Sequence, residues 1–271
     1  MAELAVSLAF LGVTVVLCEV TRRTAARLFP ADYWLYLLEA ASTFQLCLCT
    51  HELKLLGEAG QLELLAGLTL SYTVTVIHIL TFGGAFCNPN AALESVYRRR
   101  RSAGTAAALI ACQFVAAVGA QVAAASVWSL GLSDLHLRHQ RFGFRCFDPL
   151  GGTVVEAAAV ELVCAFTVQA AVLHLHKLDE RLRVPAVAAV ITALVYAGGS
   201  ISGAVFNPAL AFSIQFPCSG HTYLEYCFIY WLGPVLGVAS CILLFEKIIP
   251  FLSGKSTIGL DVPLGRKDKI Q

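Results

Sequence analysis

The sequence predicts an all-α membrane protein: an inverted repeat of six transmembrane helices plus two re-entrant half-helices, with an extra N-terminal hydrophobic segment. Three observations carry this prediction: the composition, the apolar stretches, and a motif that occurs twice. Of the 271 residues, 58% are hydrophobic and 14% are charged, whereas soluble domains carry about 25% charged residues. This composition excludes an ordinary soluble domain and a disordered chain, because only a chain in lipid needs so little polar surface.

A stretch that crosses the hydrocarbon of a bilayer needs about 20 apolar residues. Six candidates are present, at residues 33–57, 62–87, 103–132, 153–175, 184–206 and 226–245. Four clusters of basic residues lie on one side of the topology that these stretches define, and the positive-inside rule makes that side cytoplasmic, although Arg138, Arg141 and Arg145 fall on the opposite side. The clusters are Arg22, Arg23 and Arg27; the arginines at 98–101; Lys177, Arg181 and Arg183; and Arg266, Lys267 and Lys269.

A shorter apolar stretch at residues 5–18 precedes the six candidates. It lacks a basic start and a clear small-residue cleavage site, so it does not resemble a signal peptide. Its 14 residues leave two interpretations open: an extra span, or a helix lying along the interface. The predicted organisation is an N-terminal segment with a basic linker at 1–30, a membrane domain at 31–250 with repeats at 31–132 and 153–250, and a cytoplasmic tail at 251–271.

The internal repeat is the strongest organisational signal. Residues 84–92 match residues 203–211 at an offset of 119, with Gly, Ala, Asn, Pro and the last Ala identical. A lone carboxylate, Glu39 or Glu161, lies in the opening helix of each half. Because each half contains an odd number of spans, the second half enters the membrane from the opposite side.

The asparagine–proline pair in each copy predicts a helix start, since Asn is a preferred N-cap and Pro is tolerated at the first helical position. Each helix has about nine residues, or roughly 13 Å at 1.5 Å per residue, which is half a bilayer. Two such half-helices meet at the midplane with their positive N-terminal ends together. The stretches before them, residues 83–87 and 200–206, are expected to be extended.

Carboxylates inside a membrane are functional candidates by default, so Glu39 and Glu161 could form a proton relay. They could instead accept hydrogen bonds from the free N–H groups of the re-entrant stretches. Their matched positions in a duplicated scaffold favour this structural role.

Most of the ten cysteines lie in apolar stretches and are expected to act as small hydrophobic residues. Cys47, Cys49 and His51 do not predict a metal site, because alternate residues of a helix point in different directions. No cofactor or metal is predicted, and a net charge of +1 gives no reason to expect a nucleic-acid partner. Cys146 and Cys218 fall in loops on the non-cytoplasmic side, where a disulfide is permitted but not required. Cys218 is expected to hold the loop after the second half-helix.

These residues resemble the aquaporin family, whose paired Asn-Pro-Ala boxes match residues 88–90 and 207–209. The last helix of that family resembles residues 231–237, and the resemblance covers roughly residues 33–250. It implies an aquaporin-like channel domain at 31–250. It also implies a central pore constriction formed by the two boxes: Asn88, Pro89, Asn90, Asn207, Pro208 and Ala209.

Two departures from the usual pattern of the family narrow the resemblance to a part of it. The first box ends in Asn90 instead of Ala, and Leu210 stands where orthodox members carry the arginine of the selectivity filter. Cys218, nine residues beyond Ala209, resembles the unorthodox or superaquaporin branch, that of aquaporins eleven and twelve. Residues 43–53 and 196–200 look most like the eleven type, whereas residues 218–222 look more like twelve.

The resemblance implies a passive channel for water and small neutral solutes, including glycerol and hydrogen peroxide, and a homotetramer in contact with membrane lipid. It implies no enzymatic activity. The expected filter consists of Val195, Leu210 and either Leu68 or Tyr72, which lie four residues apart on one helix face. Members of this branch are associated with the endoplasmic reticulum and other intracellular membranes, and residues 267–271 resemble a dilysine retrieval signal on a cytoplasmic tail.

Three other classes remain as alternatives. A coupled transporter also uses inverted repeats and broken helices, and its proton carriers would be Glu39, His78 and Glu161. A membrane enzyme would have to use His174, His176 and Asp179, which fit a solvated loop better. A non-conducting structural member of the same fold is the third.

Overall fold

In the computed structural model, all regular elements among the described residues are helices, in agreement with the predicted fold class. The structure describes residues 2–58, 62–141, 143, 146, 150–216 and 218–253. The basic cluster near the C-terminus and the expected retrieval signal lie outside the described residues. Six described helices are long and apolar enough to cross a membrane: Glu3–Leu28, Leu64–Thr81, Ala103–Trp128, Val154–Leu175, Glu180–Ser202 and Tyr223–Leu252.

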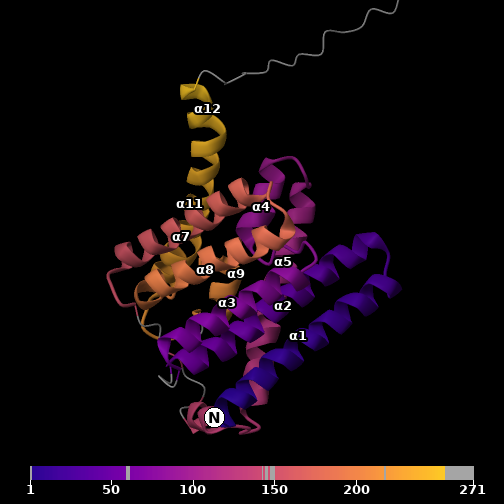
Figure 1. Cartoon of the computed structure of the whole chain (residues 1–271), viewed down its shortest axis with the longest axis vertical. Coiled ribbons are helices and arrows are strands. Elements are labelled where there is room, and N and C mark those ends of the chain that lie inside the picture. Colours follow the sequence, from indigo (N-terminus) through magenta and orange to yellow (C-terminus); the bar gives the residue numbers. More distant parts are fainter. Residues whose placement is uncertain are drawn as a thin grey trace, which may run out of the picture.

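The N-terminal helix α1 (Ala2–Leu28) differs from the expected short segment and basic linker, because the arginines lie on the same continuous 27-residue helix. α1 pairs with α2 (Ala31–Glu58) as an antiparallel hairpin (Figure 1). Arg22 is only 3% exposed, and its guanidinium donates to Gln45 Oε1 at 2.9 Å. Near the other end of α1, the Ser7 hydroxyl donates to the Glu52 carboxylate.

The helix α2 corresponds to the predicted span at residues 33–57, although it is not among the six helices that are apolar enough over a membrane-spanning length. Its charged residues explain this, since Glu39 and Glu52 are both buried inside the bundle. α2 packs against α1 on one side and against α5 (Ala103–Trp128) on another. Mean hydropathy alone would therefore miss α2 as a membrane span, because neighbouring helices satisfy its buried polar groups.

The two halves repeat one arrangement. In the first half, α2 is followed by α3 (Leu64–Thr81), the half-helix α4 (Pro89–Tyr97) and α5. In the second, α7 (Val154–Leu175) is followed by α8 (Glu180–Ser202), the half-helix α9 (Pro208–Ile214) and a last helix of α10 (Tyr223–Cys227), α11 (Gly233–Leu243) and α12 (Ile249–Leu252) joined by π-helical turns. α5 packs along α2 as α11 packs along α7, and α3 packs against α8 (Figure 1).

Small residues allow α7 and α11 to approach closely. A methyl group on Gly237 would lie 2.3 Å from the carbonyl oxygen of Leu162, and one on Gly233 would lie 2.9 Å from that of Ala158. Small residues four apart are typical of helix contacts in membranes, where packing and not water drives association. This glycine pair therefore fixes the position of the last helix.

Two boundaries differ from those expected, and one short helix is additional. α8 continues to Ser202 through part of the stretch predicted to be extended, and it ends at Gly203, whose φ is +86°. α9 has seven residues instead of about nine. The connection between the halves contains a short helix, α6 (Asp134–Arg141), which buries His136 with its Nε2 3.2 Å from Glu52 Oε1.

Candidate functional site

Each half-helix begins at its asparagine–proline pair, with the asparagine as N-cap. Asn88 Oδ1 accepts the backbone N–H of Asn90 at 3.0 Å. Asn207 Oδ1 accepts the N–H groups of Ala209 at 3.1 Å and of Leu210 at 3.3 Å. Pro89 and Pro208 occupy the first helical position, where no intrahelical donor is lost.

The N-termini of the two half-helices contact each other. The side-chain amide of Asn207 donates to the carbonyl oxygen of Cys87 at 2.7 Å, and that of Asn88 donates to the carbonyl oxygen of Phe206 at 3.4 Å. Each bond therefore runs from one box to the residue that precedes the asparagine of the other. Because an amide group has two hydrogens, each asparagine keeps a second donor.

The stretches that lead into the half-helices are strained, with Cys87 at φ 52° and Phe206 at φ 37°. Their N–H groups cannot pair within a helix, and an unpaired buried N–H costs free energy. Glu39 accepts those of Phe86 at 2.9 Å and Cys87 at 2.6 Å.

The second half repeats this anchoring. Glu161 accepts the N–H groups of Val205 at 2.9 Å and of Phe206. Glu39 and Glu161 are both almost fully buried. Each also accepts a side-chain donor, Gln113 Nε2 at 2.7 Å on Glu39 and the Ser202 hydroxyl at 2.6 Å on Glu161.

Several side chains that hold α9 were not predicted. Gln121 Nε2 donates to the carbonyl oxygens of Phe212 and Ser213, both at 2.8 Å. Lys54 Nζ donates to the carbonyl oxygen of Ile214 at 2.9 Å, which places a cation at the negative end of the helix. Gln113 and Gln121 did carry a sequence signal, since a lone polar residue in an alanine-rich span needs a partner.

The residues expected to form a filter come from three elements. Leu68 and Tyr72 lie on α3 and Val195 lies on α8, which packs against α3, and all three are half-buried. Leu210 lies on the first turn of α9 and belongs to the main apolar cluster. Their assignment as a filter stays a prediction.

The loop after α9 is tied to the connection between the halves by a disulfide between Cys146 and Cys218, with an S–S distance of 2.09 Å. The backbone N–H of Ser219 also donates to the carbonyl oxygen of Cys146 at 3.0 Å. The pairing that the sequence left open is therefore present. Among the described residues, no three His, Cys, Asp or Glu side chains are placed to hold a metal ion.

Comparison with known proteins agrees with this architecture. The family model of the major intrinsic proteins matches residues 48–245. Aquaporin-11 of Homo sapiens is 39% identical over 223 residues, which cover 82% of this chain and 82% of that protein. Aquaporin-12 of Mus musculus is 36% identical over 259 residues, which cover 93% of this chain and 89% of that protein. The chain therefore belongs to the major intrinsic protein, or aquaporin, family of integral membrane proteins, in the unorthodox branch and closer to aquaporin-11 than to aquaporin-12.

Proposed function

We propose that this chain is a passive channel for water and small neutral solutes, including glycerol and hydrogen peroxide, in an intracellular membrane. The observation that supports this most directly is the contact between the N-termini of α4 and α9 through Asn88 and Asn207. The second amide hydrogen of each asparagine is available to a passing water. A water that accepts two such donors cannot relay a proton, and the partial positive charge of both helix ends repels cations.

The proposed filter lacks a fixed charge. Leu210 occupies the position after the second box, and Val195 with Leu68 or Tyr72 completes the ring. An apolar ring offers few hydrogen-bond donors and no cation. We therefore expect weak discrimination between water and the larger neutral solutes.

We propose that α1 crosses the membrane alongside α2. Ser7 contacts Glu52, and Arg22 contacts Gln45, so the two helices run antiparallel over a shared thickness. The 27 residues of α1 extend ~40 Å at 1.5 Å per residue, which exceeds the hydrocarbon core of ~30 Å. In the proposed orientation the basic clusters and the C-terminal tail are cytoplasmic, and the membrane is that of the endoplasmic reticulum or another intracellular compartment.

We further propose a homotetramer with one pore in each subunit. Five of the α5 alanines are buried inside the subunit, but Ala107 and Ala111 are exposed and offer small side chains for close packing with another membrane helix. Mass measurement of the protein in a mild detergent tests this assignment, and a monomer would contradict it.

Reconstitution into liposomes tests the channel. Stopped-flow measurement should show water, glycerol and hydrogen peroxide fluxes above those of empty liposomes, with no dependence on an ion gradient. Asn207→Ala should lower all three fluxes, whereas Ser102→Ala, which removes the N-cap of α5 away from the boxes, should not. Flux that requires an ion gradient would instead indicate a coupled transporter, and no flux from correctly folded protein would indicate a non-conducting member.

Anchoring by the carboxylates argues against the transporter. Glu39 and Glu161 each accept two backbone N–H groups. Protonation of either would weaken the bonds that hold a re-entrant stretch. A proton carrier at these positions would therefore disturb the boxes in every cycle.

A further inference from the structure

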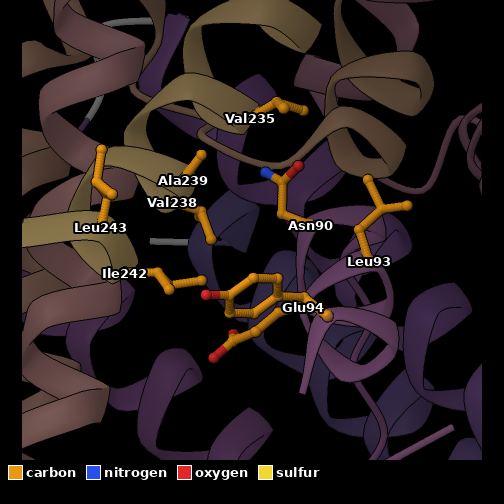
Figure 2. A pocket seen from close by; sticks show the side chains of 9 residues that line it. Asn90, Leu93, Glu94, Val235, Val238, Ala239, Ile242 and Leu243 are labelled. Atoms are coloured by element: carbon orange, nitrogen blue, oxygen red, sulfur yellow. The ribbon is translucent and has the colours of Figure 1, made fainter. Parts of the chain in front are cut away.

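A cavity of about 330 Å³ lies between the half-helix α4 and the last helix. It borders the first box, because Asn90 is part of its lining, and the α4 residues that line it, at 90, 93, 94 and 97, form one face of that helix. The facing wall is an apolar stripe on α11, here the α11 stripe, formed by Val235, Val238, Ala239, Ile242 and Leu243 (Figure 2).

Asn90 is the unusual member of this lining. Its side chain is 4% exposed, and neither atom of its amide has a hydrogen-bond partner among the described residues. The amide points from α4 toward the part of the pocket lined by Val235 and Ala239 (Figure 2). A buried amide without partners is costly, so this group is poised to accept hydrogen bonds from an occupant and to donate hydrogen bonds to it.

Two other lining residues carry polar groups: the Glu94 carboxylate, which is already bound, and Tyr97, which is 56% exposed. The Glu94 carboxylate accepts Arg98 Nε at 2.6 Å, and the same guanidinium pairs with Glu246. Glu94 therefore does not provide a free negative charge for a cationic ligand. A polyol would leave hydroxyls unpaired against the apolar α11 stripe, so the fitting ligand has one neutral polar group and an apolar body.

The volume of the cavity and the place where it opens limit the choice of ligand further. At ~30 Å³ for each water-sized group, the cavity holds roughly ten non-hydrogen atoms. Leu93, Tyr97 and Leu243 in the lining are exposed at the surface of this membrane protein. The ligand therefore enters from the acyl-chain region of the bilayer.

We infer that this pocket binds a medium-chain aliphatic alcohol from the membrane, with the hydroxyl on the Asn90 amide and the chain along the α11 stripe. A hydroxyl can both donate and accept, so it can pair with the oxygen and with the nitrogen of that amide. The inference does not rest on the proposed transport activity, although Asn90 belongs to the first box.

Photolabelling of the full-length protein in nanodiscs tests it. The probe is octan-1-ol carrying a diazirine, and peptide mass spectrometry locates the labelled residues. Label is expected on α4 and α11, and excess octan-1-ol should remove it whereas excess n-octane should not. Asn90→Leu keeps the side-chain size and should lower the label about tenfold through loss of the hydrogen bonds.

Two further variants separate binding from folding. Val238→Trp should fill the pocket and abolish the label, whereas Val115→Trp, at an exposed site on α5, should leave it unchanged. Unchanged labelling of a folded Asn90→Leu protein, or equal competition by octane, would overturn the inference. Cross-links between two copies of the chain through this face would also overturn it, because a second subunit would then cover the pocket.

Discussion

The half-helices α4 and α9 start alike and differ along the rest of their length. Both begin at an Asn N-cap followed by Pro, and the stretch before each is held by a buried carboxylate. α9 then ends after seven residues, with its last carbonyls bound by Gln121 and Lys54. α4 continues for nine residues, ends among arginines, and borders a cavity.

This difference shows which part of the repeat is constrained by its partner. Each N-terminus has to meet the other, so cap, proline and carboxylate anchor are the same in both copies. The flank and the C-terminal end contact only their local neighbours. The space beside a half-helix can therefore be filled, as around α9, or left as a cavity, as beside α4, without moving the contact between the two N-termini.

The largest expected effect is the loss of a carboxylate anchor, and it should be equal in both halves. Glu161→Leu leaves the N–H groups of Val205 and Phe206 without an acceptor, and Glu39→Leu does the same in the first half. At about 1–3 kcal/mol for each unsatisfied buried group, each variant should lose about 2–6 kcal/mol of stability. Unfolding of the purified protein in detergent measures this.

Glu156→Ala, at the exposed capping box of α7, is the control and should have a small effect. If only one of the two anchor variants were strongly destabilised, the equivalence of the two N-termini would be disproved.

The second-largest effect should distinguish the C-terminal end of α9 from that of α4. Lys54→Met leaves the carbonyl of Ile214 unpaired and should cost about 1–3 kcal/mol. Arg98→Met at the end of α4 should cost less, because the ion pairs it removes are partly exposed. Hydrogen exchange of the α9 amides should rise in the first variant and not in the second, and the opposite ranking would contradict the comparison.

Substitution of the residue after the second box should change solute selectivity, whereas substitution of the matching residue of the first box should not. Leu210→Arg places a fixed cation in the proposed filter and should lower glycerol and peroxide flux more than water flux. Ala91→Arg, at the matching position of α4, should not change the ratio of the three fluxes. Equal loss of all fluxes from a folded Leu210→Arg protein would show that Leu210 does not set selectivity.

The smallest effect concerns His139 on α6, on the side of the molecule where Lys54 holds α9. Burial, with the nearby His136 and Lys54, lowers the pKa of His139 below its ordinary 6.5. The unfolded chain therefore binds the proton more readily, and stability falls as the pH drops below about 6.5. Lys54→Met should raise the pKa of His139 in an NMR titration, and His139→Gln should remove its share of the pH dependence.

The local parts of the fold could be predicted from the sequence. The caps at Asn88 and Asn207 follow from short-range rules, and the order of elements follows from hydropathy and the repeat. The extent of α1 could not be predicted, because Glu19, Arg22 and Arg23 resemble the end of an apolar segment. Glu19 forms ion pairs with both arginines, at 3.0 Å and 2.7 Å, and the helix continues through them.

Contacts between residues far apart in the chain could not be predicted from the sequence. Lys54 lies 160 residues from the carbonyl that it binds, and no local pattern connects the two. The cavity beside α4 depends on the distance between two helices far apart in the chain. Asn90 gave a visible signal as a departure from the usual box, but its surroundings decide what that departure means.

The extra helix α1 also affects where a label can be placed. In the proposed topology α1 precedes two repeats of three spans, so the number of crossings is odd. The N-terminus and α12 lie at opposite ends of the molecule (Figure 1). A tag before α1 and a tag after α12 therefore report from different compartments, and the fluorescence of the two fusions under a membrane-impermeant quencher gives the orientation of the whole chain.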